Sequence, residues 1–215
     1  MSEPCQIYLL TPPVISDVDR FCAALEETLT AAPVACLQIR LKEFENSALV
    51  QAGRAISEIC HAANIEVILN DQPELVAEIG ADGAHIGQEA MDYFSSRELL
   101  GGDAILGVTC HNSKELAFAA AKAGADYVAF GAFFDTPTKT PKAKAELEIL
   151  EWWQEAVEIP CVAIGGITVE NAQSVIQAGA DFIAISSGVW DHPDGPAKAV
   201  SQFSRLCSAH MQSQA

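Results

Sequence analysis

The chain has 215 residues, of which 50% are hydrophobic and 19% are charged, and its formal net charge at pH 7 is −17. Proteins that bind nucleic acids or anionic membranes carry basic surfaces, because contacts to phosphates supply much of their affinity. The charge therefore excludes general binding to polyanions, and any phosphate group must be held in a local site. The hydrophobic content is sufficient for a large core and excludes a disordered chain.

The seven cysteines include no Cys-x-x-Cys pair and predict neither a disulfide framework nor a zinc site. No apolar run approaches the ~18 residues that a membrane-spanning helix needs, and the first residues lack the basic-then-apolar order of a signal peptide. We therefore expect a cytoplasmic protein that binds neither nucleic acid nor membrane. Cys110 precedes His111; sequence neighbours do not establish a nucleophile and its base, and a buried structural cysteine is the alternative.

Short apolar runs, each typical of a buried strand, alternate along the chain with amphipathic stretches of helical periodicity. In chain order the predicted strands are 7–10, 35–40, 67–70, 83–87, 105–108, 127–131, 161–165 and 182–186. The helices between them include 16–31, 46–62, 113–123 and 169–178, and a closing helix covers 195–209. Gly-Ala-Asp precedes three of the strands, at 80–82, 124–126 and 179–181, which indicates a repeated βα unit. We expect an α/β fold, a (β/α)₈ TIM barrel that forms a single domain over residues 1–215.

Functional residues of such barrels lie at the C-terminal ends of the strands. Polar or glycine residues stand at all the predicted strand ends: Thr11; Gln38, Arg40 and Lys42; Asn70 and Asp71; His85, Gln88 and Glu89; Thr109 and His111; Thr136, Thr138 and Lys139; Gly165 and Gly166; Ser186 and Ser187. The alternation in the second strand predicts that Gln38, Arg40 and Lys42 project to one side. A central strand with two cations needs anions to face, so we expect these side chains to converge on phosphate.

The ends of the seventh and eighth predicted strands indicate a phosphate pocket. Gly165 and Gly166 allow close approach of the backbone, and Ser186 and Ser187 offer hydroxyl and N–H donors. Thr168 is expected to cap the helix that follows.

Two further segments have both a structural and a functional interpretation. Asp71 could cap a helix, or it could hold Mg²⁺ against a diphosphate, and its position facing cations favours the metal. The segment from Thr136 to Lys139 could be a solvated loop, or a clamp over a leaving diphosphate.

Seven motifs, in chain order, together resemble the thiamine phosphate synthase family, over a stretch from Tyr8 to about Val189. They are Gln38-x-Arg40-x-Lys42, Asn70-Asp71, His85-Ile86-Gly87-Gln88-Glu89, Gly107-Val108-Thr109-Cys110-His111, Thr136-Pro137-Thr138-Lys139, Ala163-Ile164-Gly165-Gly166-Ile167 and Ser186-Ser187.

The resemblance implies a transferase of thiamine biosynthesis that joins hydroxymethylpyrimidine diphosphate to a thiazole phosphate and releases diphosphate, with Mg²⁺ as cofactor. It assigns the pyrimidine diphosphate to Gln38, Arg40, Lys42, Asn70, Thr109 and Lys139, with Arg40, Thr109 and Lys139 as the catalytic residues. It assigns the thiazole phosphate to Thr136, Thr138, Gly166, Ser186 and Ser187. Asp71 would be a ligand of Mg²⁺. The expected partners are small phosphorylated substrates, and a homo-oligomer is left open.

One departure from the family pattern concerns the metal. The family has an aspartate directly after Gly-Gln-Glu, as a second metal ligand, where this chain has Ala90. A methyl group cannot coordinate a cation, so Glu89, Asp92 or water would have to compensate. Two alternatives therefore stand beside the synthase: a non-catalytic or weakly active phosphate-binding paralogue, and a thiazole tautomerase that uses His111.

Overall fold

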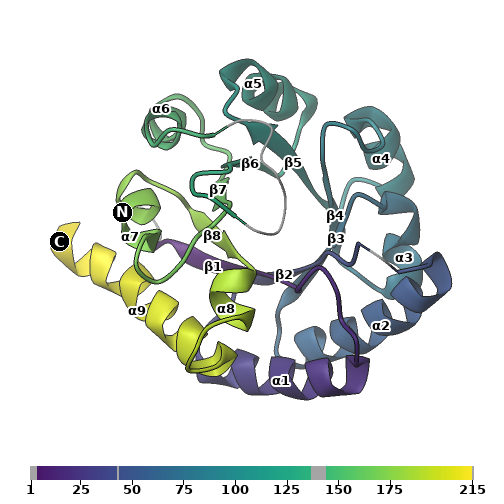
Figure 1. The fold of residues 1–215 in the computed structure, drawn as a ribbon. Coiled ribbons are helices and arrows are strands. Elements are labelled where there is room, and N and C mark those ends of the chain that lie inside the picture. Colours follow the sequence, from purple (N-terminus) through teal and green to yellow (C-terminus); the bar gives the residue numbers. More distant parts are fainter. Residues whose placement is uncertain (1–3, 43, 137–143, 215) are drawn as a thin grey trace.

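Eight parallel strands form a closed barrel in the computed structural model, which describes residues 4–42, 44–136 and 144–214 (Figure 1). Each strand pairs with the next along the chain, and the last pairs with the first. The strands are β1 (Gln6–Leu10), β2 (Cys36–Ile39), β3 (Glu66–Asn70), β4 (Gly83–Ile86), β5 (Ile105–His111), β6 (Tyr127–Gly131), β7 (Cys161–Ile164) and β8 (Phe182–Ile185). The predicted (β/α)₈ barrel is confirmed.

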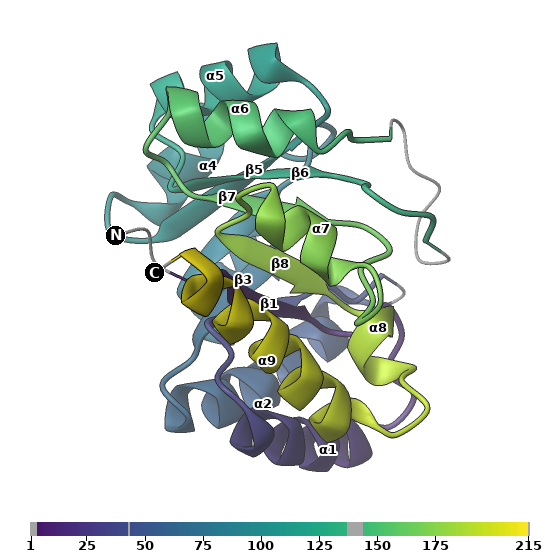
Figure 2. The ribbon, with the colours of Figure 1, turned by 90° about the vertical axis from the view of Figure 1, so that its left-hand side faces the viewer.

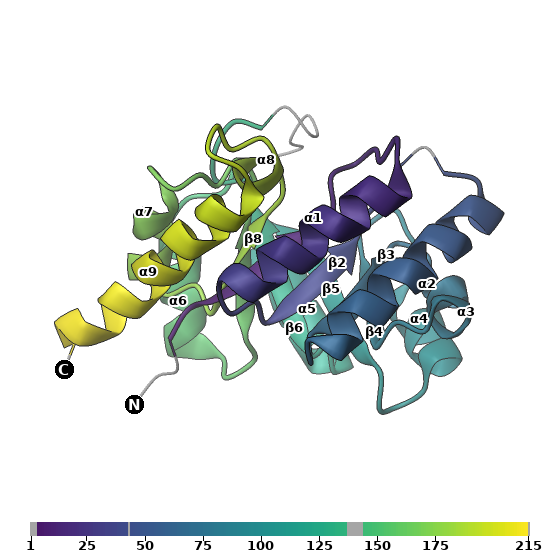
Figure 3. The same ribbon diagram turned by 90° about the horizontal axis from the view of Figure 1, so that it is seen from below.

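Helices surround the barrel and cover the outer face of the sheet (Figures 1 and 2). They are α1 (Val18–Ala31), α2 (Asn46–Ala62), the 3₁₀ helix η1 (Pro73–Leu75), α3 (Val76–Ile79), α4 (Tyr93–Leu100), α5 (Lys114–Ala123), α6 (Glu148–Ala156), α7 (Ala172–Gln177), α8 (Ser187–Trp190) and α9 (Pro196–Gln214). Figure 3 shows α9, α1 and α2 side by side, with α1 in contact with both of the others. In the part of the chain that the structure describes, no helix is long and apolar enough to cross a membrane.

The three Gly-Ala-Asp segments fasten neighbouring strands at the N-terminal end of the barrel. Each aspartate carboxylate accepts a hydrogen bond from a backbone N–H near the start of the preceding strand: Asp82 from Val67 (2.7 Å), Asp126 from Leu106 (2.7 Å) and Asp181 from Cys161 (2.8 Å). Each carboxylate also contacts one side chain, which is His61, Arg97 or Gln154 respectively. The repeat seen in the sequence is therefore a repeated strand-joining contact.

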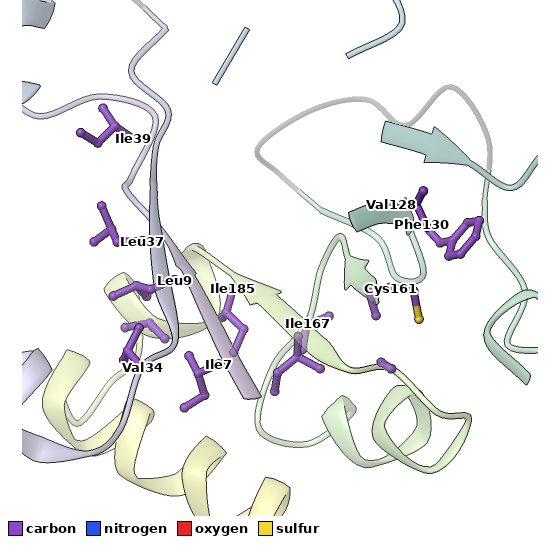
Figure 4. Packing of buried hydrophobic residues seen from close by; sticks show 14 of the residues in the cluster. Ile7, Leu9, Val34, Leu37, Ile39, Val128, Phe130, Cys161, Ile167 and Ile185 are labelled. Atoms are coloured by element: carbon purple, nitrogen blue, oxygen red, sulfur yellow. The ribbon is translucent and has the colours of Figure 1, made fainter. Parts of the chain in front are cut away.

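Alternation along the strands separates two hydrophobic clusters, because successive side chains point to opposite faces of a sheet. The larger cluster fills the layer between strands and helices, and Figure 4 shows part of it, including Ile7 and Leu9 of β1 and Leu37 of β2. The smaller cluster fills the barrel interior and consists of Tyr8, Leu10, Ile68, Tyr127, Ala129, Val162 and Ala184. The interior is tight: a Cβ on Gly107 would lie 2.0 Å from Cζ of Tyr127, so a glycine is required opposite that ring.

Three predicted element boundaries are wrong by three residues or more, and one of them is the end of the closing helix, which is Gln214 rather than residue 209. The helix expected at 169–178 begins only at Ala172, because Asn171 Oδ1 accepts from the Thr168 N–H (2.8 Å) and closes a turn, so Thr168 does not cap the helix. The fifth strand runs to His111 rather than Val108, with an irregular register between Thr109 and His111. All seven cysteines are free thiols.

Candidate active site

A cavity of about 440 Å³ opens at the C-terminal end of the barrel, and every strand end contributes to its wall. Among its lining residues are nine that the sequence assigns to substrate or metal: Gln38, Arg40, Asn70, Asp71, Thr109, Thr136, Gly166, Ser186 and Ser187. Thr138 and Lys139 lie outside the described residues. The structure therefore brings together residues from both predicted subsites in one cavity.

Of the three side chains predicted to converge at the end of β2, two line the cavity. Gln38 is buried in the barrel interior, and Arg40 is partly buried at the cavity. Burial lowers the pKa of Arg40, and the charge of Asp71 opposes that shift. Lys42 is exposed and does not line the cavity, because β2 ends at Ile39 and its alternation does not continue. The expected convergence of three donors is thus reduced to two.

Asp71 is held in a fixed orientation at the end of β3. Its backbone has a φ of 60°, a left-handed conformation that aspartate tolerates better than most residues. One carboxylate oxygen accepts from the Gly87 N–H (2.8 Å), and the other accepts from the side-chain amide of Asn70 (2.8 Å). Asp71 caps no helix, and its carboxylate stands at the cavity wall beside Asn70.

The loop after β4 contains the two acidic residues that could compensate for Ala90 at the cavity. Glu89 and Ala90 both line the cavity. Asp92 instead caps α4: its carboxylate accepts from the backbone N–H groups of Phe94 (3.1 Å) and Ser95 (3.2 Å) and from the Ser95 hydroxyl (2.6 Å). Of the two acidic residues that could compensate for Ala90, only Glu89 therefore reaches the cavity wall.

The opposite wall is built from the ends of β6, β7 and β8. Gly166 has a φ of 66°, and a Cβ there would lie 2.3 Å from the backbone oxygen of Asp135, so the chain passes too closely for any side chain. The Ser186 hydroxyl donates to the backbone oxygen of Thr11 (3.0 Å), which ties the end of β8 to the end of β1. Ser187 begins the short helix α8 at the cavity edge.

Five side chains form one hydrogen-bonded network across the barrel interior, here called the buried network. Gln38 Nε2 donates to Tyr8 Oη (2.9 Å), the hydroxyls of Tyr8 and Tyr127 are 2.8 Å apart, and Tyr127 Oη lies 3.0 Å from His85 Nδ1. His85 Nε2 lies 2.7 Å from Thr109 Oγ1. Burial lowers the pKa of His85 to about 4; the charge of Asp71 opposes that shift and the charge of Arg40 adds a smaller effect to it, so the ring is neutral at pH 7.

Sequence reasoning missed the two tyrosines of this network. Both lie in strands that read as apolar, and a phenol ring is counted as hydrophobic. The signal that could have found them is parity: Tyr8 stands two residues before Leu10, and Tyr127 two before Ala129, on the inward face.

Cys110 and His111 do not form a nucleophile and base. Cys110 is fully buried in the cluster between strands and helices, and burial raises the pKa of its thiol to about 12. His111 lines the cavity and has a φ of 53°. Their side chains therefore belong to different environments, and the structural interpretation of Cys110 stands.

The described residues contain no cluster of three or more histidine, cysteine, aspartate or glutamate side chains able to hold a metal by themselves. A cation at this cavity would need oxygen atoms from a ligand in addition to those of the protein. Mg²⁺ is commonly bound in this way, by one or two carboxylates and substrate phosphates.

Comparison with known proteins gives a consistent result. The family model for thiamine monophosphate synthase matches residues 7–189. The thiamine-phosphate synthase of Rhodospirillum centenum is 53% identical over 202 residues, which cover 94% of this chain and 97% of that protein. That of Hyphomonas neptunium is 52% identical over 205 residues, which cover 94% and 93% respectively. Among solved structures, a thiamine phosphate pyrophosphorylase from Pyrococcus furiosus superposes with a TM-score of 0.83 at 27% identity, covering 95% of this chain and 96% of the other. The chain belongs to the thiamine monophosphate synthase family.

Proposed function

We propose that this transferase joins hydroxymethylpyrimidine diphosphate to a thiazole phosphate, forming thiamine phosphate and releasing diphosphate. The observation that carries the proposal is the cavity itself, in which Arg40, Asn70 and Asp71 face Gly166 and Ser187 across one opening. Its volume of about 440 Å³ lies in the range of small-molecule sites. One wall therefore suits a diphosphate and the other a phosphate monoester.

The reaction breaks one bond and forms another. The carbon–oxygen bond between the pyrimidine methylene and the diphosphate breaks, and its electron pair leaves with the diphosphate. The thiazole nitrogen then supplies the electron pair of the new carbon–nitrogen bond. No proton needs to move, so catalysis consists of positioning and of neutralising the leaving charge.

The residues of the first wall have roles that follow from their chemistry. Arg40 offers planar N–H donors and a permanent charge to the leaving diphosphate. Thr109 offers a hydroxyl, Gln38 and Asn70 offer amides, and Lys139 supplies a second cation in the proposed assignment. Lys42 lies in the exposed segment after β2, where its ammonium group would add to the positive electrostatic field that attracts phosphate.

The residues of the second wall hold the thiazole phosphate in the proposed assignment. Close approach of the backbone at Gly166 and the hydroxyls of Thr136, Thr138 and Ser187 suit a phosphate monoester, because each supplies a donor or the space for one. Ser186 keeps its place in the assignment through its position in the cavity lining, since its hydroxyl donates to the backbone oxygen of Thr11.

The donor set at the cavity fits Mg²⁺. Asp71 presents a carboxylate fixed by two hydrogen bonds, and Glu89 contributes a second carboxylate to the lining. Asp71 would hold the ion, with Glu89 or water in place of the ligand that Ala90 cannot supply. When bound, the ion neutralises charge that develops on the diphosphate.

The test is diphosphate release by the purified chain with both substrates and Mg²⁺. We expect turnover, and Arg40→Gln should lower kcat/KM about 100-fold because the leaving charge loses its fixed partner. Arg54→Gln is the matched control, since Arg54 is exposed on α2 and pairs with Glu78 away from the cavity. Absence of diphosphate release at saturating Mg²⁺ would overturn the synthase proposal and leave a phosphate-binding paralogue.

A further inference from the structure

The buried network reaches the cavity at Gln38, His85 and Thr109, and its two tyrosines do not line the cavity. Gln38 and Thr109 line the cavity, whereas Tyr8 and Tyr127 belong to the barrel interior. Except for Thr109, each member is at most 8% exposed. Buried hydroxyl and imidazole groups must satisfy their hydrogen bonds within the network, so the direction of each bond is fixed by its neighbours.

The donor-to-acceptor direction of these hydrogen bonds is set at the Gln38 end of the network. The side-chain nitrogen of Gln38 has only hydrogens to offer, so Tyr8 Oη accepts this bond. The hydrogen of the Tyr8 hydroxyl is then directed to its other partner, Tyr127 Oη, at 2.8 Å. Tyr127, having accepted from Tyr8, donates its own hydrogen to His85 Nδ1 at 3.0 Å.

The same direction continues through the histidine. Nδ1 of His85 accepts a hydrogen bond and therefore has no proton, which places the ring proton on Nε2. Nε2–H donates to Thr109 Oγ1 at 2.7 Å. The hydroxyl hydrogen of Thr109 then has no role inside the network and is directed to whatever the cavity holds.

We propose that Tyr8 and Tyr127 are positioning residues, which act through the Nε2–H tautomer of His85 to present the Thr109 hydroxyl to the cavity as a hydrogen-bond donor. At the other end, the oxygen of the Gln38 amide is presented as an acceptor. The site is therefore polarised before a ligand binds: it accepts an N–H group at Gln38 and donates to an anionic oxygen at Thr109.

The identification of a ligand that fits this polarity rests on the proposed function. An aminopyrimidine diphosphate has an amino group to donate and phosphate oxygens that accept, and Arg40 stands in the same wall. Fixing the direction in advance avoids reorienting a hydroxyl when charge develops on the leaving group, which is the advantage of a preorganised site.

The direct test reads the tautomer of His85 by ¹⁵N NMR on the full chain with labelled histidine, its signals assigned by their loss in His85→Gln. We expect a protonated Nε2 and an unprotonated Nδ1. In Gln38→Glu, recorded at a pH at which the new carboxyl is ionised, the side chain has no hydrogen to donate, so Tyr8 must donate to it, every bond reverses, and the proton of His85 moves to Nδ1. A proton on Nδ1 in the unsubstituted chain, or an unchanged tautomer in Gln38→Glu, would overturn the proposal. Neither result depends on turnover, so this test is independent of the proposed function.

A double-mutant cycle on diphosphate release separates positioning from general structure. Tyr127→Phe keeps the ring and removes the hydroxyl; we expect it to lower kcat/KM about tenfold alone, but less than twofold when combined with Thr109→Val. Tyr93→Phe, which removes a hydroxyl bonded to Arg97 on α4, is the matched control and should leave kcat/KM unchanged. An equal loss from Tyr127→Phe in both backgrounds contradicts the positioning role. The same cycle can be read from the Kd of inorganic diphosphate with Mg²⁺, which requires no turnover.

Discussion

Replacement of Gly166 by alanine isolates the contribution of close backbone approach to the second wall of the cavity. The added Cβ would lie 2.3 Å from the Asp135 oxygen and 2.8 Å from the Phe134 carbonyl carbon. Ordinary contact begins at 3.4 Å, so the segment before Thr136 must retreat by 3.4 − 2.3 = 1.1 Å. A displacement of about 1 Å near a reacting centre can lower the rate about 100-fold, which is the loss of kcat/KM that we expect.

The matched control is Gly80→Ala, at the C-terminal end of α3. Gly80 also has a positive φ, of 76°, but a Cβ there would contact nothing within 4 Å. Both substitutions carry the strain of a left-handed alanine, about 1–2 kcal/mol in the free energy of unfolding. Only Gly166→Ala should also lose activity, measured as diphosphate release after both unfolding free energies are determined in urea. Equal kcat/KM in the two variants would refute the assignment of Gly166 to the substrate wall.

Three further substitutions have expected outcomes. Ala90→Asp should lower the Mg²⁺ concentration for half-maximal diphosphate release about tenfold, because it adds a carboxylate to the cavity lining; an unchanged requirement would mean that the ion does not approach this position. Asp126→Ala should lower the free energy of unfolding by about 1–2 kcal/mol, since it leaves the Leu106 N–H without its acceptor, while Arg97 keeps the backbone oxygens of Gly101 and Ala104. The exposed Asp103→Ala should change it by less than about 0.5 kcal/mol. Ser57→Ala should raise it by about 1 kcal/mol in the same denaturation assay, because Oγ of Ser57 is buried without a hydrogen-bond partner, and a loss of stability would contradict that description.

The misplaced end of β5 and the misplaced side chain of Lys42 have a common cause. A polar residue after an apolar run indicates the end of a strand only where that residue enters a loop. Thr109 and His111 are polar because they face the cavity, yet both are still paired with β6, so β5 extends past the predicted end. Lys42 is the opposite case, because the alternation that placed it beside Arg40 ends with the strand at Ile39.

The cavity lining was predictable where it follows strand ends. Arg40, Asn70, Asp71 and Thr109 were found because a barrel of parallel strands gathers all its C-terminal ends on one face. The role of Asp92 was not predictable, since a carboxylate one residue before a helix can bind a ligand or cap the helix, and the choice depends on where α4 begins.

The sequence by itself determined the barrel, the order of its strands and the cavity residues that follow them, because burial patterns and turn residues are local properties of the chain. Only the tertiary structure decided that Tyr8 and Tyr127, 119 residues apart, share a hydrogen bond inside the barrel and direct His85 toward Thr109. The barrel interior exists only because β8 pairs with β1 and closes the sheet. The hydrogen bond between the two tyrosines therefore depends on the packing of all eight strands, which no local stretch of sequence specifies.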